Sequence, residues 1–378
     1  MKITFLVSSS LHKTRRYILL SACSVFFLLS CNLRENIEHV YISTEDFIPQ
    51  GLCEKSRMFC FLSDSIGYAV STKDTLVYGI EREWSVVSHT QDRGRTWIKY
   101  GEFEGRGTNI FRSCSNIFFT TVNTLEDYSC ISEIWKLNDI DSKFERISRI
   151  DDAIFGFHAF DDMTYCYFPH YGGDMTDYYL TYDSGVNWKK KKLPGASTGL
   201  HCCSYSKDKI FCTILGSDLF DNKLYVFDII NQTEKCIRIG DSHDVVMAAD
   251  TLLAFAIKMS FYHFSDSDEQ LTYISSFKWS RRSGRYYPHY MTDSNGIVIC
   301  SGSEFYAKKG KHNCIFFSTD SGLNWKTVIM DDNIMQNSLG FNENAMTNIP
   351  TKDGTSILYQ RYEDNMLHII NIKKKEMP

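Results

Sequence analysis

The sequence predicts an all-β protein, and more specifically a seven-bladed β-propeller built from four-stranded sheets. Three observations predict this fold. A short turn-like motif occurs three times, its copies are spaced by multiples of one period, and segments with helical hydrophobic periodicity are scarce. Aromatic residues form 14% of the chain, a content that suits a strand-rich core.

The motif has a hydroxyl residue, an Asp two positions later, a Gly two further, a Thr or Asn two further, and then Trp. Its copies are Thr90–Trp97, Thr181–Trp188 and Ser318–Trp325. Asp92 and Asp183 are 91 residues apart, and Asp183 and Asp320 are 137 apart. These distances are two and three times a period of about 45 residues, which is the length of a four-stranded blade.

Each residue type in the motif has a role in a tight turn between two strands. The Asp carboxylate accepts hydrogen bonds from the backbone N–H groups that follow it, and Gly supplies a positive φ without a Cβ clash. Trp provides a large apolar ring that packs the hairpin onto its neighbour. We therefore assign structural roles to Asp92, Gly94, Trp97, Asp183, Gly185, Trp188, Asp320, Gly322 and Trp325.

The three segments resemble Asp-boxes, also called BNR repeats. These occur in β-propellers such as sialidases, other glycoside hydrolases, sortilin-type receptors and photosystem II assembly factors. The resemblance implies that each box lies on the turn between the third and fourth strands of a blade, away from the functional face. It implies an architecture and leaves the activity open.

Weaker marks continue the period. With the three boxes, they give six blade marks at Asp92, Asp139, Asp183, Asp228, Asp266 and Asp320. Phe144 follows Asp139 in the place of the box Trp. Patterns of strand, Asp-led turn and strand precede the boxes at Phe61–Val70, Phe160–Tyr167 and Tyr290–Ile299.

The two ends of the chain predict a shared seventh blade. Strand-like runs occur at His39–Ser43, Thr355–Tyr362 and Met366–Ile372. Propellers often close by letting a terminal strand complete the last blade, which removes exposed edges. Six blades are the alternative, because the Asp266 mark is faint and its neighbours are unevenly spaced.

The N-terminus predicts export. Three basic residues, Lys13, Arg15 and Arg16, precede an apolar run of about 13 residues at Tyr17–Leu29, which is typical of a secretory signal. The run ends in Ser30-Cys31, which resembles a bacterial lipobox; the resemblance implies that Cys31 is acylated. The alternative is a buried Cys after an ordinary signal.

These features predict the domain organisation and the location. Residues 1–30 are expected to form the signal peptide, 31–37 a short tether and 38–378 a single propeller. In enteric bacteria, the residue after the lipidated Cys sorts lipoproteins between membranes. If this chain is similar to those lipoproteins, Asn32 implies that the protein is anchored at the periplasmic face of the outer membrane.

Charge argues against nucleic acid as a partner. The chain has 41 basic and 46 acidic residues, and residues 1–30 contain four of the basic ones, Lys2, Lys13, Arg15 and Arg16, and none of the acidic ones. The mature chain therefore has 37 basic against 46 acidic residues, a net charge of −9. Broad binding to nucleic acid needs the opposite sign.

Of the 13 cysteines, several could face each other across hairpins of an exported protein. The candidate disulfides are Cys203–Cys212, Cys300–Cys314, Cys114–Cys130 and Cys53–Cys60. Each requires Cα atoms within about 7 Å. The alternative is buried free thiols that act as small apolar side chains.

The sequence favours binding over catalysis. Members of the sialidase family carry a Phe- or Tyr-Arg-Ile-Pro motif, and Phe47-Ile48-Pro49 lacks the Arg. We find no metal-ligand, phosphate-loop or nucleophile-elbow motif, so we expect no catalytic residues, no cofactor and no metal. The paired carboxylates of other glycosidases cannot be recognised from sequence, so a glycan-binding or glycan-hydrolysing propeller is the alternative function.

Two surface segments complete the prediction. Lys189–Lys192 is expected to be a charged outer strand that blunts an edge. Arg281, Arg282, Arg285, Tyr286 and Tyr287 lie in a predicted loop between blades, and Arg and Tyr are enriched at binding hot spots. We therefore expect a lipid-anchored propeller that recognises a protein partner across one face, as a toxin-neutralising immunity lipoprotein or as an envelope assembly factor.

Overall fold

All regular elements that the structure describes are β-strands. The computed structural model describes residues 40–52, 56–77, 80–113, 116–127, 129–138, 143–169, 177–193, 200–206, 208–214, 222–239, 246–249, 251–255, 260–265, 267, 270–276, 285–306, 310–331, 346–360 and 366–374. The predicted signal peptide, tether and Cys31 lie outside these residues.

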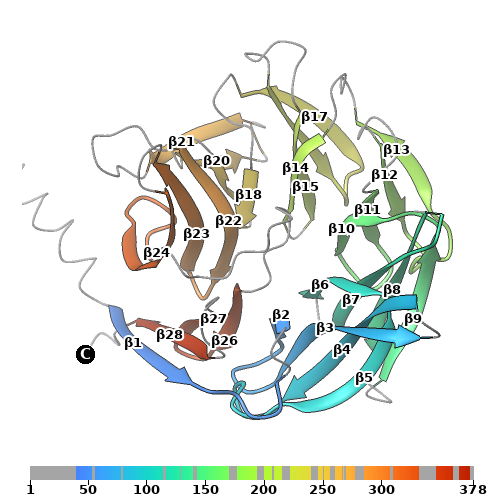
Figure 1. The fold of residues 1–378 in the computed structure, drawn as a ribbon. Helices are drawn as coiled ribbons and strands as arrows, with labels where there is room; N and C mark the ends of the chain where they lie inside the picture. Colours follow the sequence, from blue (N-terminus) through green and yellow to red (C-terminus); the bar gives the residue numbers. More distant parts are fainter. Residues whose placement is uncertain are drawn as a thin grey trace, which may run out of the picture. The chain divides into compact units, whose positions relative to one another are not determined.

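The described strands form seven antiparallel four-stranded sheets (Figure 1). Blade 1 contains β2 (Ser56–Phe61), β3 (Gly67–Val77), β4 (Ile80–Thr90) and β5 (Ile98–Glu104), and blade 2 contains β6 (Arg106–Ser113), β7 (Asn116–Thr124), β8 (Cys130–Asn138) and β9 (Lys143–Ile150). Blade 3 contains β10 (Ile154–Ala159), β11 (Tyr165–Pro169), β12 (Asp177–Thr181) and β13 (Lys189–Lys192), and blade 4 contains β14 (Leu200–Tyr205), β15 (Lys209–Ile214), β16 (Lys223–Asp228) and β17 (Thr233–Arg238).

The remaining sheets follow the same order. Blade 5 contains β18 (Val246–Ala249), β19 (Leu252–Phe255), β20 (Ser260–Ser265) and β21 (Gln270–Ser276), and blade 6 contains β22 (Arg285–Ser294), β23 (Ile297–Tyr306), β24 (Gly310–Ser318) and β25 (Lys326–Asp331). Blade 7 contains β26 (Met346–Thr351), β27 (Gly354–Gln360), β28 (Leu367–Lys374) and β1 (Val40–Phe47).

The compact unit Thr44–Asn371 is a seven-bladed β-propeller. First strands of neighbouring blades contact each other around the ring, for example β2 with β6 and with β26, so blade 1 meets blade 7. The order β1-β28-β27-β26 joins the start of the chain to its end, which confirms the predicted closure and excludes six blades. Residues Met1–Ser43 and Ile372–Pro378 form a second unit, in which 40–43 and 372–374 are the described ends of β1 and β28.

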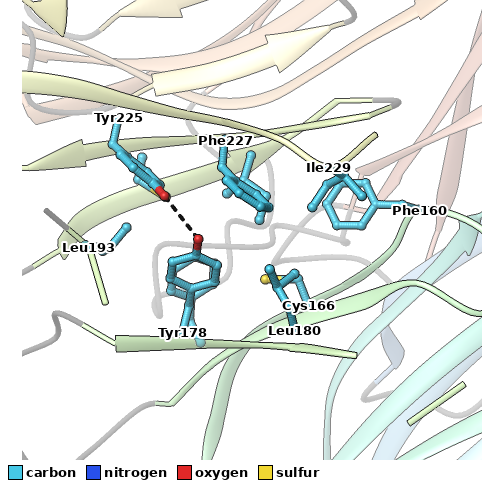
Figure 2. Packing of buried hydrophobic residues seen from close by; sticks show 11 residues of the cluster. Phe160, Cys166, Tyr178, Leu180, Leu193, Tyr225, Phe227 and Ile229 are labelled. Carbon is cyan, nitrogen blue, oxygen red and sulfur yellow. Dashed lines mark hydrogen bonds between the residues drawn. The ribbon is translucent and has the colours of Figure 1, made fainter. Parts of the chain in front are cut away.

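The core lies between the blades. Each described cluster of buried apolar side chains combines residues of two neighbouring blades. Between blades 3 and 4 the hydroxyls of Tyr178 and Tyr225 lie 3.0 Å apart, and Cys166 and Phe227 pack beside them (Figure 2). Because both phenols are buried, their pKa values are raised and they stay neutral.

The first turn of each blade joins its first and second strands. Three Asp residues, Asp64, Asp161 and Asp293, were predicted to cap such turns, and only Asp161 does so. Asp161 caps its turn as expected, since its Oδ1 accepts the N–H groups of Met163 and Thr164 at 2.7 and 2.6 Å. The predicted hairpin at Tyr290–Ile299 is present, but Asp293 does not lead its turn, since it pairs with Val298 inside β22. The chain reverses at Asn295-Gly296, where two positive φ values of 54° and 68° suit a two-residue hairpin. In blade 1 the Ser63 hydroxyl, not Asp64, accepts the N–H groups of the turn.

The six blade marks all fall between the third and fourth strands of a blade. Asp228 ends β16, and its carboxylate accepts the backbone N–H of Asn231 at 2.7 Å, as a shortened box would. Asp139 and Asp266 follow β8 and β20 but lie outside the described residues. Phe144 packs against Tyr68 and Tyr100 of blade 1, with ring centroids 6.1 and 5.5 Å apart, as expected for the Trp place.

The strand register corrects the disulfide predictions. Cys130 pairs with Thr124 at the end of β7 and is a free thiol, so the structure has no bridge from it to Cys114. Cys300 pairs with Phe316, two positions away from Cys314, so these cysteines lie on a diagonal.

The thiols are consistent with this register. Cys60, Cys130 and Cys300 are free thiols in the structure, which contradicts the bridges predicted for them. Burial raises the pKa of the Cys60 thiol to about 12. Cys203 lies directly opposite Cys212 in the β14–β15 register, but Cys212 forms no disulfide in the structure, which contradicts this predicted bridge as well. Cys53 and Cys114 lie outside the described residues.

Candidate functional site

The three motif copies form nearly identical turns, which we call the box turns. In residues 181–188 the Thr181 hydroxyl donates to Asp183 Oδ1 (2.6 Å) and accepts the N–H of Gly185 (3.2 Å), and Asp183 accepts both the backbone and the side-chain N–H groups of Asn187 (2.9 and 2.7 Å). These bonds lower the pKa of Asp183 to about 2, the bond from Thr181 contributing most. The same contacts recur in 90–97 and 318–325.

Two successive residues with positive φ make the reversal in every box turn. The glycines have φ values of 86–87°, and the residues before them, Arg93, Ser184 and Ser321, have φ values of 55–64°. The predicted need for Gly is therefore confirmed, and the residue before it adopts the same left-handed region.

Each box Trp packs on the preceding blade. Trp325 of blade 6 stacks on Phe261 of blade 5 at 4.1 Å between centroids, beside Leu252, and its Nε1–H lies within hydrogen-bond distance of Ser275 Oγ (3.3 Å) and Gly322 O (2.9 Å). Trp188 donates to Ser148 of blade 2 (3.1 Å), and Trp97 packs in a cluster with blade 7. We call the groove that receives the ring the Trp seat.

Box turn 90–97 also forms hydrogen bonds and ion pairs with blade 7. We call the interface between blades 1 and 7 the seam, and the contacts of Arg93 and Arg95 across it the seam latch. Arg93 donates to Ser356 Oγ (2.6 Å) and to Asn371 Oδ1, and lies 3.6 Å from Glu45. Arg95 pairs with Glu45 at 2.8 Å and covers the ring of Phe47 at 5.0 Å. The other two box turns have Ser and an apolar residue at these two positions.

We call the end of the propeller that carries the box turns the box face. The first turn and the box turn of a blade meet there: Arg93 N–H donates to Ser65 O (3.0 Å) in blade 1, and Ser184 N–H donates to Met163 O (2.9 Å) in blade 3. Large apolar side chains project from turns on this face. They are Val186 (76% exposed), Ile230 (73%), Leu323 (59%), Met163 (55%) and Ile66 (39%).

A cleft of about 600 Å³ opens between blades 4 and 5 at the box face. Its lining includes Lys209, Val226, Asp228, Thr233, Lys235 and Phe264. A second cleft of about 300 Å³ at the same blade interface is lined by residues that include Ile237, Phe255 and Leu271.

The larger cleft is a Trp seat without a Trp. In the seat of blade 5, Leu252 opens the second strand, and Phe261 pairs with Ser275. In blade 4 the equivalent positions are Lys209, which opens β15, and the pair Val226–Lys235. These three residues line the cleft, so blade 4 offers the same groove that receives a box Trp elsewhere.

The sequence of blade 5 explains the vacancy. The turn between β20 and β21 spans only residues 266–269, whereas that between β24 and β25 spans 319–325 and ends in Trp325. Leu271, opposite Phe264, takes the position that Phe144 has in blade 2, where it lies opposite Leu137. Leu271 packs against the core between blades 4 and 5 but does not line the larger cleft, so this aliphatic side chain fills only part of the groove that a ring fills elsewhere. The signal for this cleft in the sequence is the absence of an aromatic residue five positions after Asp266, where Leu271 stands.

The structure places the predicted surface segments as follows. Lys189–Lys192 forms β13, the outermost strand of blade 3, as predicted, and Lys190 pairs with Asp177 at 2.7 Å. Arg285, Tyr286 and Tyr287 do not form a loop: they begin the inner strand β22 and pair with β23. Their end of the strand lies away from the box face, and Arg281 and Arg282 lie outside the described residues.

Neither a metal site nor a membrane span is found in the part of the chain that the structure describes. No group of three or more His, Cys, Asp or Glu residues there could hold a metal ion. No helix there is long and apolar enough to cross a bilayer.

Comparison with known proteins supports the fold. No protein-family model matches the chain, and no curated protein matches it. Solved β-propellers do. The structure of YCF48 bound to a D1 peptide has a TM-score of 0.51 and 13% identity, over 86% of this chain and 94% of that one.

Two further structures are similar to a comparable degree. The WD40 domain of coronin from Toxoplasma gondii has a TM-score of 0.54 and 12% identity, over 90% of this chain and 87% of that one. The β-propeller domain of the trilobed protease from Pyrococcus furiosus has a TM-score of 0.50 and 11% identity, over 86% and 97%. At these identities the likeness concerns the fold alone.

Proposed function

We propose that this protein is a non-enzymatic binding protein, anchored to the membrane through Cys31, that recognises a protein partner across one face of the propeller. The observation that carries the proposal is the set of apolar side chains at the tips of turns on the box face, which is the end opposite to the functional face that the resemblance to Asp-box propellers implies. Val186 and Ile230 expose about three-quarters of their surface. Their turns close without these side chains: the hydrogen bonds of turn 181–188 involve Thr181, Asp183 and Asn187, and those of the Ile230 turn join Asn231 to Asp228.

Apolar residues at the tips of turns on one end of a rigid ring suit a protein interface. Burying each such side chain against a partner would gain about 1.5–3 kcal/mol of transfer free energy. The turns are held by hydrogen bonds and, in the box turns, by a Trp that packs on the preceding blade, so little conformational entropy is lost on binding. The peptide-bound YCF48 structure is a propeller with a protein-derived ligand, and we extend that behaviour to this chain.

Two forms of the function fit the predicted location in the bacterial envelope. One is an immunity lipoprotein that neutralises a toxin, and the other is an assembly factor for an envelope complex. Both require the lipid anchor. We expect Cys31→Ser to release the protein from membranes and to abolish acyl labelling; unchanged membrane fractionation would contradict anchoring at Cys31.

Cross-linked capture from bacterial envelope extracts tests the function. The expected result is one stoichiometric protein partner that is lost from the variant Val186→Ser/Ile230→Ser/Leu323→Ser. Charge reversal of Arg285, which begins β22 at the opposite end, should leave capture intact, contrary to the binding role expected for it from the sequence. Retention on a glycan array without any protein partner would favour the glycan-binding alternative instead.

A further inference from the structure

We propose that the cleft between blades 4 and 5 receives an aromatic side chain, Trp or Tyr, that the protein partner inserts into the vacant Trp seat. This inference rests on the proposed function and deepens it, because it assigns the chemistry of the partner. The partner's ring takes the place that Trp325 takes on blade 5 and Trp188 on blade 2.

The floor of the cleft is apolar and its sides are polar. Val226 from blade 4 and Phe264 from blade 5 form the floor and expose only 4% and 3% of their surface, so the partner's ring would contact them by a limited area and lie mainly between polar and charged side chains of blade 4. Elsewhere the seat holds ring against ring, as Trp325 against Phe261 at 4.1 Å. Offset or edge-on contacts of this kind stabilise an aromatic pair beyond the area that it buries.

The rim favours an aromatic residue with a polar group over an aliphatic one. Asp228, Asn231 and Thr233 offer oxygen acceptors for an indole N–H or a phenol O–H. In the filled seats the Trp N–H has such acceptors in Ser148 and Ser275. Lys209 and Lys235 replace Leu252 and Ser275 of the filled seat, and ammonium groups are attracted to the face of an aromatic ring.

Ion pairs hold the Lys209 side chain in place, and the exposed Ile230 nearby puts the seat within the proposed interface. The Lys209 ammonium is held 3.1 Å from Asp208 and 3.5 Å from Asp228, which directs it toward the rim. Ile230 projects from the adjoining turn of the same blade and is 73% exposed. An inserted aromatic anchor surrounded by apolar contacts is the usual pattern of a binding hot spot.

A pair of matched variants tests the seat. Thr233 pairs with Asp228 in blade 4, and Thr272 pairs with the equivalent residue His263 in blade 5; both threonines are exposed. Thr233→Trp places a ring at the rim of the vacant seat, whereas Thr272→Trp places one beside a seat that Trp325 already fills. The probe is a phage library of random 12-residue peptides, selected on the full chain.

We expect the selected peptides to contain Trp or Tyr and to bind Thr233→Trp at least tenfold more weakly than the wild type and Thr272→Trp. Thermal melts of both variants establish that they are folded. Peptides that lack aromatic residues, or that bind both variants equally, would overturn the aromatic seat and leave the proposed function standing. No enriched peptide at all would contradict both.

Discussion

At the residue scale, the box Asp residues show how one carboxylate organises a turn. Asp183 accepts three hydrogen bonds, from Thr181 and from the backbone and side chain of Asn187. A protonated carboxyl accepts these bonds poorly, so the folded turn holds the proton off and the pKa falls to about 2. The stabilisation is therefore present above the unfolded pKa of about 3.9 and is lost as the pH falls through the folded pKa.

This linkage predicts a pH-dependent effect of Asp183→Asn. The substitution should lower the melting temperature at pH 7, because the amide replaces one acceptor oxygen with a donor. The difference between the wild type and the variant should shrink between pH 4 and pH 2, where the wild type loses the ionised form. Melts followed by near-UV circular dichroism measure it. A difference that stays constant down to pH 2 would contradict the role of the charge.

At the element scale, the residues on either side of the box Gly differ between the box turns according to the neighbouring blade. The turns 181–188 and 318–325 carry Ser and an apolar residue where 90–97 carries Arg93 and Arg95. Only 90–97 borders the seam where the start and the end of the chain meet, and its arginines contact Glu45, Ser356 and Asn371. The motif thus supplies a common hairpin, and its variable positions adapt it to the neighbouring blade.

Replacing Arg93 and Arg95 by the residues at the matching positions of 181–188 should destabilise the seam. We expect Arg93→Ser/Arg95→Val to lower the free energy of unfolding by about 1–3 kcal/mol, because charge-assisted hydrogen bonds of the partly buried Arg93 are lost. Arg95→Val alone, which removes an exposed pair, should cost less than about 1 kcal/mol. Urea unfolding measures both. An equal loss of unfolding free energy in the two variants would contradict the role of Arg93, because Arg95 would then account for the whole effect.

At the scale of the whole molecule, sequence periodicity predicted most of the fold. Six marks and the three strand-like runs at the two ends of the chain predicted seven blades with a shared last blade, because each blade repeats the same turn chemistry. Phe144 was predicted in the Trp place for the same reason. The periodicity failed at Asp293, where Asn295-Gly296 makes a tighter hairpin than the Asp-led turn expected.

The candidate site could not be predicted from the sequence in the same way. The vacant seat requires knowing that each Trp packs on the preceding blade, so that a missing ring in blade 5 opens a groove in blade 4. The seam latch joins residues more than 260 positions apart. The segment Arg285–Tyr287, predicted as a loop, is the start of strand β22, because these residues pair with β23 and Tyr favours strands. Pro288 is tolerated in this strand because it lies at a shift in register.

The central claim is that one face of this propeller binds a protein, and site-specific photo-crosslinking tests it most directly. A photoreactive amino acid at Val186 or Ile230 reports from the box face. At Leu125 it reports from the opposite end, where this side chain is 42% exposed in the β7–β8 turn. We predict a discrete protein adduct in bacterial envelopes from Val186 and Ile230 and none from Leu125. An adduct from Leu125 alone, or no protein adduct from any of the three, would contradict the claim.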